Sequence, residues 1–512
     1  MELKEKLTIA WKRIKADRKT DFIIGDYEYI VYDRYHEEMI EELAQRVESA
    51  GAKYRPDSLR KIRVPKISHT TRPGALPTIP DRVLYQYLVD EIAEEIEKNL
   101  VPIVDKVVHS YRYSNDRRSV KMFRFDTASY NTYQERIQEM AEEHEYIVTT
   151  DISDYFERIY HHDLENALRG LGGNDNNITL LMSLLRKWQM GNSYSIPQGI
   201  WPSDYLGNIY LDPIDKFMIR SGFKYCRFVD DIRIGTDTYL DAEKALLELE
   251  EQLGRCGLTL NASKTRIIPS NKIEDELFPH KQRLQEISDS LCVSVNPYHE
   301  TEDDEEPLER ENHETQSIRQ LFQEQLESSS PEPHIMRFCL KHFRKFLDEE
   351  ILDFILENLS SLVVVTPQVV NYLITISEDV DLRDKIVREV SSFISRELTC
   401  YDWQLMWLLH CLDRIGYVSD EAVANIRKAL DKSELHESVA VHLILLIGKH
   451  GDMEDRNQLL GRYDREHSLW IKRAILFAIK DITVTKRNHF YSYCKGNDFF
   501  TDKVIDYITS LQ

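Results

Sequence analysis

Two short stretches of the chain have the hydrophobic pattern of buried strands that end in carboxylates. Residues 146–150, Tyr-Ile-Val-Thr-Thr, run directly into Asp151, and residues 228–229, Phe-Val, run into Asp230 and Asp231. Apolar, β-branched and aromatic runs of this kind predict buried strands. If the two strands are neighbours in one sheet, their ends bring the three carboxylates together.

The rest of the first half mixes the helical period of 3.6 residues with the strand period of 2. This pattern predicts helices over 1–50 with a strand-like, tyrosine-rich patch at 26–35, strand, turn and strand over 62–77, a helix over 81–100 and helical structure over 122–143. Further on it predicts a hairpin over 223–235 with its acidic pair at the tip, a helix over 239–254, and a turn and strand over 258–268.

From about residue 333 onward the pattern is that of successive amphipathic helices. Examples begin at Val363, Trp403, Val439 and Trp470, and the helices are punctuated by Pro367, Gly448 and Gly451. Paired helices of this size favour an α-solenoid of the HEAT kind, although no clean sequence period is visible. The predicted fold class is therefore α+β: an antiparallel sheet with helices, followed by an all-α helical-repeat domain.

Composition places the chain among ordinary globular proteins of several domains, with 512 residues, 42% hydrophobic and 30% charged. No apolar run approaches the roughly 20 residues that span a bilayer, and the charged N-terminus lacks a signal core. The 7 cysteines form no C-x-x-C pair, which argues against a zinc site or a disulfide framework. We expect a cytoplasmic protein without membrane partners.

The net charge of −22 counts against broad, non-specific nucleic-acid binding, which depends on neutralising phosphates. The charge is uneven, however. A basic run covers residues 55–72, and the most acidic stretch covers residues 299–306. A local basic surface on an acidic molecule suits guided handling of phosphates better than wrapping of a duplex.

Carboxylates that converge repel one another and stay ionised only if a cation lies between them. Hard oxygen ligands suit Mg²⁺, which binds one or two carboxylates together with substrate phosphates. Two such ions about 4 Å apart activate an attacking oxygen and stabilise a leaving one in phosphoryl transfer. An Asp-Asp pair alone is more often a solvated turn. The hypothesis of a two-metal nucleotidyl transferase therefore depends on the other motifs.

Several further residues carry candidate chemistry, each with a plainer alternative. Lys66 and Arg72 suit a phosphate, because an Arg fork binds its oxygens in bidentate fashion and Lys adds a point charge; the alternative is a solvated face. Phe156 can block a ribose 2′-hydroxyl if a nucleotide lies over Asp151, or it is only core. Lys264 can be the general acid for a departing pyrophosphate, or a surface lysine.

Pro197-Gln198-Gly199 lies just before a predicted helix. Such a loop fixes the amide of Gln198 at a cleft, and Gly199 lets a ligand approach the backbone closely. A lone Pro-Gln-Gly means little by itself.

In this order, the motifs resemble the fingers and palm of bacterial reverse transcriptases, the lineage of group II intron enzymes, retrons and defence-associated enzymes. The resemblance covers about residues 55–270 and includes three further motifs: Arg72-Pro-Gly with Asp81-Arg82-Val, Ser110-Tyr-Arg-Tyr, and the stretch 156–164. Phe228 departs from the commoner Tyr at the first position of its four-residue motif.

The resemblance implies a role for each candidate residue. Metals, Mg²⁺ or Mn²⁺, would be held by Asp151, Ile152, Asp230 and Asp231. Catalysis would use the three aspartates and Lys264. The dNTP would contact Lys66, Arg72, Phe156 as the sugar gate, Gln198 and Gly199.

A palm joined to a thumbless helical half resembles most closely the abortive-infection (Abi, AbiK-like) reverse transcriptases, a defence-associated bacterial group. We expect an N-terminal segment and fingers at 1–125, the palm at 126–270, an acidic linker or helical connector at 271–332 and the helical repeats at 333–512.

This group implies untemplated, protein-primed DNA synthesis in anti-phage defence. It also implies a DNA product attached to a Tyr or Ser hydroxyl and assembly as a homo-oligomer. Tyrosines between Tyr27 and Tyr35, or Tyr491 and Tyr493, are candidate primers. The alternatives are a templated enzyme of the retron or retroelement type, using an RNA or DNA template, and a helical-repeat interaction protein with a vestigial palm.

Overall fold

The computed structural model describes residues 2–18, 27–116, 118–124, 126–277, 316–328, 331–432 and 434–511. The chain divides into two compact units. The first contains Met1–Gly25, Tyr35–Lys61 and Pro73–Pro279, and the second contains Asp26–Arg34, Ile62–Arg72 and His280–Gln512. Each unit is described by itself. The acidic stretch 299–306 lies outside the described residues.

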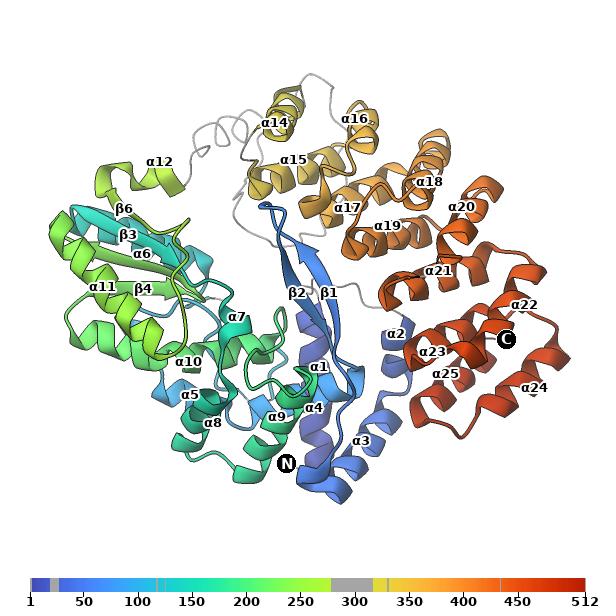
Figure 1. The fold of residues 1–512 in the computed structure, drawn as a ribbon, viewed down its shortest axis with the longest axis horizontal. Coiled ribbons are helices and arrows are strands. Elements are labelled where there is room, and N and C mark those ends of the chain that lie inside the picture. Colours follow the sequence, from blue (N-terminus) through green and yellow to red (C-terminus); the bar gives the residue numbers. More distant parts are fainter. Residues whose placement is uncertain are drawn as a thin grey trace. The chain divides into compact units, whose positions relative to one another are not determined.

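A four-stranded antiparallel sheet is the centre of the first unit (Figure 1). Its strands, in spatial order, are β4 (Lys224–Phe228), β5 (Asp231–Thr236), β3 (Tyr146–Asp151) and β6 (Arg266–Pro269). The predicted strand ending at Asp151 and the predicted hairpin are thereby confirmed, and the two are neighbours in one sheet.

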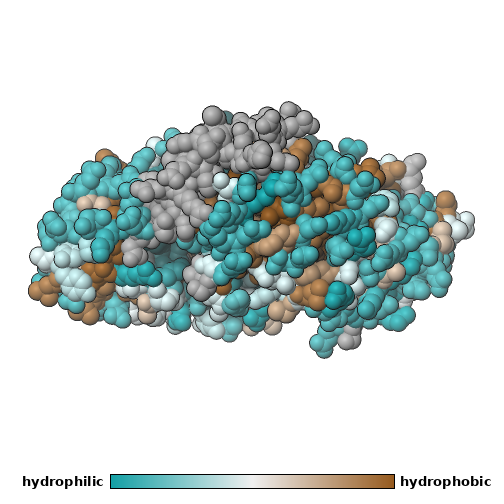
Figure 2. Space-filling model, turned by 90° about the horizontal axis from the view of Figure 1, so that it is seen from above, coloured by the Kyte–Doolittle hydropathy of each residue, from teal (hydrophilic) through white to brown (hydrophobic). Residues whose placement is uncertain are grey.

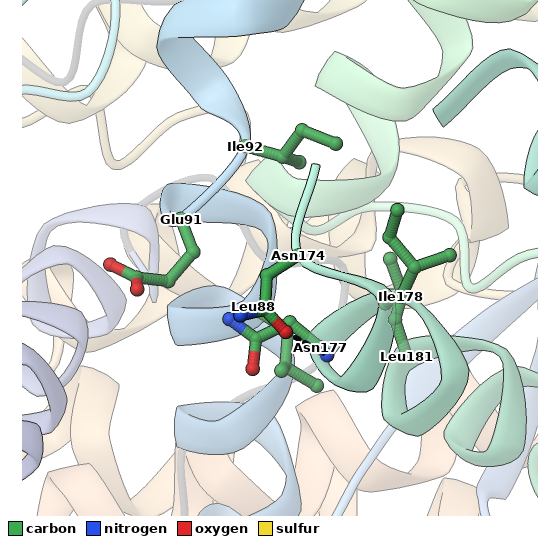
Figure 3. Close-up of a pocket in the computed structure, with 7 residues that line it drawn as sticks. All are labelled: Leu88, Glu91, Ile92, Asn174, Asn177, Ile178 and Leu181. Carbon is green, nitrogen blue, oxygen red and sulfur yellow. Dashed lines mark hydrogen bonds between the residues drawn. The ribbon is translucent and has the colours of Figure 1, made fainter. Parts of the chain in front are cut away.

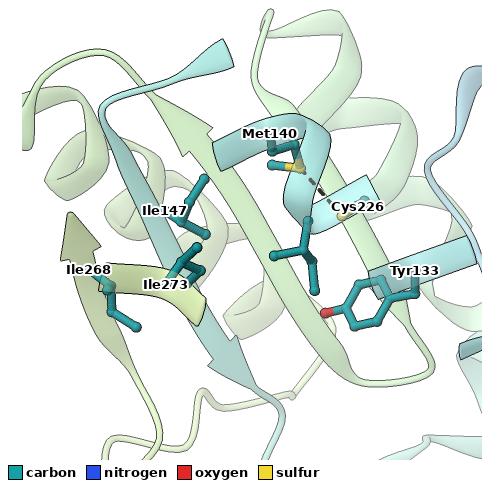
Figure 4. Close-up of a cluster of buried hydrophobic side chains, with 7 residues drawn as sticks. Tyr133, Met140, Ile147, Cys226, Ile268 and Ile273 are labelled. Atoms are coloured by element: carbon teal, nitrogen blue, oxygen red, sulfur yellow. Dashed lines mark hydrogen bonds between the residues drawn. The ribbon is translucent and has the colours of Figure 1, made fainter. Parts of the chain in front are cut away.

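Helix α6 (Tyr130–Glu143) packs on this sheet through side chains that recur at helical spacing. Tyr133, Ile137 and Met140 from α6 meet Ile147 of β3 and Cys226 of β4 in a buried cluster (Figure 4). The helix begins later than the sequence pattern predicts, because the Ser129 side chain accepts a hydrogen bond from the Thr132 amide and caps it. The prediction of helical structure from residue 122 is therefore wrong for 122–124 and 126–129.

The first unit contains further helices besides α6. They are α1 (Leu3–Asp17), α3 (His36–Ala50), α4 (Ile79–Asp90), α5 (Ala93–Asn99), α7 (Tyr155–Arg158), α8 (His161–Gly170), α9 (Asp175–Trp188), α10 (Trp201–Arg220), α11 (Tyr239–Arg255) and α12 (Ile273–Leu277). The helix predicted over 239–254 is confirmed by α11. The helix predicted over 81–100 is two helices, because Ile92 leaves the helical region with φ −112° and ψ 1°.

A two-stranded hairpin is formed by β1 (Arg60–Pro65) and β2 (Thr71–Leu76), as the Pro- and Gly-rich pattern predicts. Its turn is closed by the Lys66 amide, which donates to the Thr70 carbonyl at 2.8 Å. Residues 62–72 of the hairpin belong to the second unit, whereas Arg60 and Lys61 belong to the first.

Helix α2 (Tyr27–Arg34) corrects the prediction of a strand-like patch at 26–35. Its rings at Tyr27 and Tyr32 are buried and meet Phe477 and Phe500 of the second unit. The buried Glu28 carboxylate accepts from Arg473 Nη1 at 2.7 Å. Because these aromatic side chains are buried against other helices, tertiary packing overrides their preference for strands.

Residues 316–511 of the second unit, where the structure describes them, are mostly helical, and the sequence prediction of successive helices is confirmed. Its helices are α14 (Gln316–Glu327), α15 (Pro333–Lys345), α16 (Leu352–Glu357), α17 (Thr366–Ile376), α18 (Val380–Ser395), α19 (Asp402–Ile415), α20 (Asp420–Leu430), α21 (Glu437–His450), α22 (Met453–Arg462), α23 (Leu469–Ala478), α24 (Val484–Cys494) and α25 (Phe499–Ser510).

These helices stack in two series. Each odd-numbered helix from α15 to α23 contacts the next odd-numbered one, and α16, α18 and α20 form a second series (Figure 1). Gly448 lies inside α21 rather than between helices, because α21 and α23 approach so closely that a Cβ there would lie 2.3 Å from Ala478 Cα. A side chain larger than hydrogen does not fit at this crossing.

On the face shown in Figure 2, hydrophilic residues predominate and hydrophobic ones lie scattered among them. No described helix has the length and apolar character needed to cross a bilayer. The cysteines that the structure describes are all free.

Candidate active site

Three aspartates meet where β3 and β5 pair. Asp151, the last residue of β3, lies directly opposite Asp231, the first residue of β5. Asp230 occupies the two-residue turn before β5, and its carbonyl oxygen accepts a hydrogen bond from the Ile152 amide at 3.2 Å. The pairing therefore brings together residues about 80 positions apart in sequence, as the two strand-like stretches predict.

The carboxylates are close enough to affect one another's protonation. Burial, together with the negative charges of Asp151 and Asp231, raises the pKa of Asp230 to about 6, although a backbone hydrogen bond and the charge of Lys264 act to lower it. Asp151 has a buried Oδ1 atom with no hydrogen-bond partner. A buried carboxylate oxygen without a donor is unusual, and it is available to a cation.

Two basic side chains hold two of these carboxylates. Lys264 Nζ lies 2.5 Å from Asp151 Oδ2, and Arg233 Nη1 lies 2.5 Å from Asp231 Oδ1. Burial acts to lower the pKa of Lys264, but its hydrogen bond to Asp151 and the charge of that carboxylate raise it overall. Lys264 is therefore an ammonium group at neutral pH and can donate a proton.

The oxygen ligands at these two strand ends fit a divalent metal ion. Hard carboxylate oxygens converge from two adjacent strands, and Asp151 Oδ1 lacks a donor. Among the described residues, no three His, Cys, Asp or Glu side chains gather closely enough to hold an ion by themselves. This arrangement agrees with a Mg²⁺ that takes one or two carboxylates and completes its shell with water and substrate phosphates.

Phe156 and the Pro197–Gly199 loop lie next to each other. The Phe156 carbonyl accepts from the Ile196 amide at 2.9 Å, and its ring, 7% exposed, lies against Gly207 of α10. Gly199 has φ +87°, a conformation that favours glycine, and Gln198 is half-buried. A glycine turn is therefore present just before α10, as the sequence predicts, and it lies beside the ring of Phe156.

Lys66 and Arg72 lie in the second unit, at the turn of the hairpin and on β2. The three aspartates, Lys264, Phe156 and Gln198 lie in the first unit. The assignment of Lys66 and Arg72 to a triphosphate is therefore a proposal that rests on the sequence.

Arg233 is a site residue that the sequence analysis missed. It is nearly buried, it stacks over the ring of Tyr133 at 5.7 Å, and it forms two hydrogen bonds with Asp231. The sequence contains a signal for this contact, because Arg233 lies two positions after Asp231 and such residues on a strand share one face. Tyr133 completes this support, since its hydroxyl donates to the Asp231 carbonyl at 2.9 Å.

A small pocket among the described residues lies away from the three aspartates. It opens between α4 and α9 and is lined by residues that include Leu88, Ile92, Asn174, Ile178 and Leu181 (Figure 3). It has room for no more than about one water molecule, which is far less than a ligand pocket needs. None of its lining comes from β3, β5 or the turn that carries Asp230, so the carboxylates, not this pocket, define the candidate site.

Comparison with known proteins shows which family the region around this site resembles. Residues 64–283 match the family described as "Reverse transcriptase (RNA-dependent DNA polymerase)". This region contains the sheet, all three aspartates, Lys264 and the Pro197–Gly199 loop. The match indicates a nucleotidyltransferase of the RNA-directed DNA polymerase kind.

One curated relative is Protein YkfC of Escherichia coli (strain K12). It is 24% identical over 268 residues, which cover 43% of this chain and 66% of that protein. The chain thus matches about two thirds of the length of this relative.

Similar solved structures include two telomerases. The telomerase of Candida albicans, solved with the TWJ fragment of telomeric RNA, is 12% identical, with a TM-score of 0.32 and coverage of 84% of this chain and 68% of that one. The apo telomerase of Candida tropicalis is 12% identical, with a TM-score of 0.32 and coverage of 94% and 74%. Likeness at this level supports no conclusion about function.

Proposed function

We propose that the chain is a DNA polymerase of the reverse-transcriptase type that adds dNTPs by a two-metal reaction, with its palm at residues 126–270. The observation that carries the proposal is the pairing of Asp151 with Asp231, beside Asp230 in the adjoining turn. Acidic side chains that converge at two strand ends can hold the metal ions that such a reaction uses. They lie within the region that matches reverse transcriptases.

Each residue then has a defined part. Mg²⁺ or Mn²⁺ would be held by the carboxylates of Asp151, Asp230 and Asp231 with the Ile152 carbonyl, and would supply charge stabilisation to the phosphoryl transfer. Lys264, already at the site, would give its proton to the departing pyrophosphate. The triphosphate would be bound by Lys66 and Arg72, and the sugar and base would meet Phe156, Gln198 and Gly199.

Incubation of the purified protein with Mg²⁺ and labelled dNTPs, with and without template and primer, tests this function. We expect incorporation by the wild type and a loss of at least about 10³-fold in Asp230→Asn. Asp237→Asn is a matched control, because Asp237 follows the far end of β5 and its side chain is 75% exposed. A wild type that incorporates nothing under any of these conditions would refute the proposal.

We further propose that synthesis is untemplated and protein-primed, and that the protein acts in the bacterial cytoplasm as a homo-oligomer in abortive infection. Support comes from the resemblance of the motifs to abortive-infection reverse transcriptases and from the helical second unit, to which we assign a HEAT-like role in place of a thumb. Incorporation without template and primer is the expected result.

A templated reaction of the retron type is the second candidate, and the description of the matching family as RNA-dependent favours it. Activity that requires an added template and primer, or an RNA that co-purifies with the protein, would select this candidate. It would leave the polymerase proposal intact and remove only the untemplated part.

The priming residue can be sought by mass spectrometry of the peptide that carries DNA. Among the tyrosines named as candidates, Tyr27, Tyr29, Tyr32 and Tyr491 are buried, whereas Tyr493 is 64% exposed. A priming hydroxyl must reach the active site of its own or another copy, so exposure favours Tyr493. DNA on a buried tyrosine would contradict this choice.

A further inference from the structure

The turn that carries Asp230 is held in an unfavourable backbone conformation. Val229, the first of its two central residues, has φ +55°. A two-residue hairpin turn with positive φ at this position normally has Gly, Asn or Asp there. For a β-branched residue such a φ is a genuine outlier, and it persists only where the surroundings impose it.

Two side chains impose it by holding both backbone groups of Val229. The Val229 amide donates to Ser110 Oγ at 2.9 Å, and the Val229 carbonyl accepts from Arg227 Nη1 at 3.0 Å. Ser110 and Arg227 are 1% and 0% exposed, so both bonds come from side chains that are buried in the protein. The peptide groups on both sides of the strained residue are therefore fixed from the protein interior.

Ser110 and Arg227, which together we call the clamp, are themselves held in place by other buried groups. Arg227 donates through Nε and Nη2 to the two oxygens of the buried Asp215, each at 2.8 Å. Its Nη1 also donates to Asn208 Oδ1 at 2.9 Å, and the Asn208 amide donates to the Ser110 carbonyl at 2.7 Å. A fully hydrogen-bonded buried network of this kind specifies one geometry.

We propose that Ser110 and Arg227 are positioning residues that hold Val229 in its left-handed conformation and thereby place the Asp230 carboxylate for metal binding and nucleotidyl transfer. The inference rests on the proposed function for its catalytic consequence. It gives a role to Ser110 in the Ser-Tyr-Arg-Tyr motif, which the assignment of metal and dNTP ligands does not use. Neither residue touches substrate in this account, because both act through the backbone of the turn.

The test first removes the hydrogen bond from Ser110 and then relieves the backbone strain at Val229 that makes this bond necessary. Ser110→Ala deletes the acceptor of the Val229 amide, and we expect kcat to fall about tenfold or more, with the KM for dNTP changed by less than about twofold. Val229→Gly alone keeps kcat within about twofold, because glycine adopts positive φ without strain. In the Ser110→Ala, Val229→Gly double variant we expect most of the lost activity to return.

Binding of Mn²⁺ alone, measured by electron paramagnetic resonance, gives a readout that does not require turnover. Ser110→Ala weakens Mn²⁺ binding several-fold, and Val229→Gly in the same chain restores it. Thr236→Val is the matched control. It removes a buried hydroxyl from the opposite end of β5, where the hydroxyl donates to the Thr238 carbonyl. We expect it to leave kcat and Mn²⁺ binding unchanged.

The outcomes separate this inference from the proposed function. A wild type that binds Mn²⁺ but incorporates no dNTP refutes the polymerase, while the Mn²⁺ series still decides on the clamp. The clamp is refuted if Ser110→Ala leaves both readouts within twofold of wild type, or if Val229→Gly does not restore them. If Ser110→Ala does not fold, the single Val229→Gly variant decides, and a loss of more than about twofold in it refutes the inference.

Discussion

Lys264 Nζ lies 2.5 Å from Asp151 Oδ2, although the two residues are 113 positions apart in the chain. The lysine neutralises the same carboxylate that the proposed function assigns to a metal ion. If the proposed function holds, it has two effects on the reaction: it competes with the ion for Asp151, and it brings a proton donor to the place where pyrophosphate would depart.

Replacement of Lys264 separates these effects. In Lys264→Met we expect kcat to fall by about 10²-fold, because the general acid is lost, while Mn²⁺ binds more tightly because Asp151 loses its competitor. Lys264→Arg keeps the ion pair but cannot release its proton at neutral pH, so its kcat falls as well. Full activity of Lys264→Arg would show that charge alone matters.

The matched control for this series is Lys244→Met. Lys244 is also an exposed lysine paired with an aspartate, Asp241, but it lies on α11 and touches none of the three site carboxylates. We expect it to leave kcat and Mn²⁺ binding unchanged. Steady-state kinetics and a Mn²⁺ titration measure both quantities for all variants.

Phe156 gives a prediction about sugar selectivity. Its ring is 7% exposed and lies against α10, beside the Gln198 loop. In Phe156→Val we expect the preference for dNTP over rNTP, measured as the ratio of kcat/KM, to fall by about 10- to 100-fold, because space opens for a 2′-hydroxyl. Phe343→Val also removes a buried ring, but from the second unit, and should leave the ratio unchanged. An unchanged ratio in Phe156→Val would mean that the ring is only core.

The sequence predicted the elements of the site better than it predicted its contacts. The strand ending at Asp151 and the hairpin carrying Asp230 were readable because apolar runs and turns are encoded locally. The ion pair of Arg233 with Asp231 and the bonds of Ser110 to the turn were not, because they depend on side-chain positions fixed only after folding. The helix at 27–34 was misjudged for a related reason: its tyrosines are strand formers that pack between helices.

Asp81 provides a pH-dependent prediction that is independent of the metal site. It is 1% exposed, and its two oxygens accept from the Tyr54 hydroxyl at 2.8 Å and the Asp57 amide at 2.7 Å. Burial and the nearby Asp57 charge raise its pKa from 3.8 to about 7. Between these values the folded protein keeps a proton that the unfolded chain releases, so stability falls as pH rises through this window.

In Asp81→Asn we expect this loss to disappear. Above pH 7 the free energy of unfolding of the variant exceeds that of wild type by up to about 4 kcal/mol. This gain is reduced by the loss of one hydrogen bond, because the amide nitrogen of Asn cannot accept it. At pH 4 the variant gains nothing. Urea unfolding across this pH range measures the difference. Asp105→Asn, at an exposed carboxylate, should run parallel to wild type. A constant offset between Asp81→Asn and wild type at every pH would contradict the prediction.

Two glycines of the second unit test the close packing of its helices. A Cβ at Gly448 would lie 2.3 Å from the Ala478 Cα and 2.4 Å from its Cβ, contacts that no side-chain rotation relieves. Gly448→Ala must therefore push α21 and α23 apart, and we expect it to lower the free energy of unfolding by about 2 kcal/mol or more.

Gly461 lies inside α22 with nothing within 4 Å of its Cβ position. Gly461→Ala should raise stability by up to about 1 kcal/mol, because alanine loses less backbone entropy in a helix. Thermal unfolding of the two variants should show opposite shifts, and equal shifts would mean that α21 and α23 are not packed this closely.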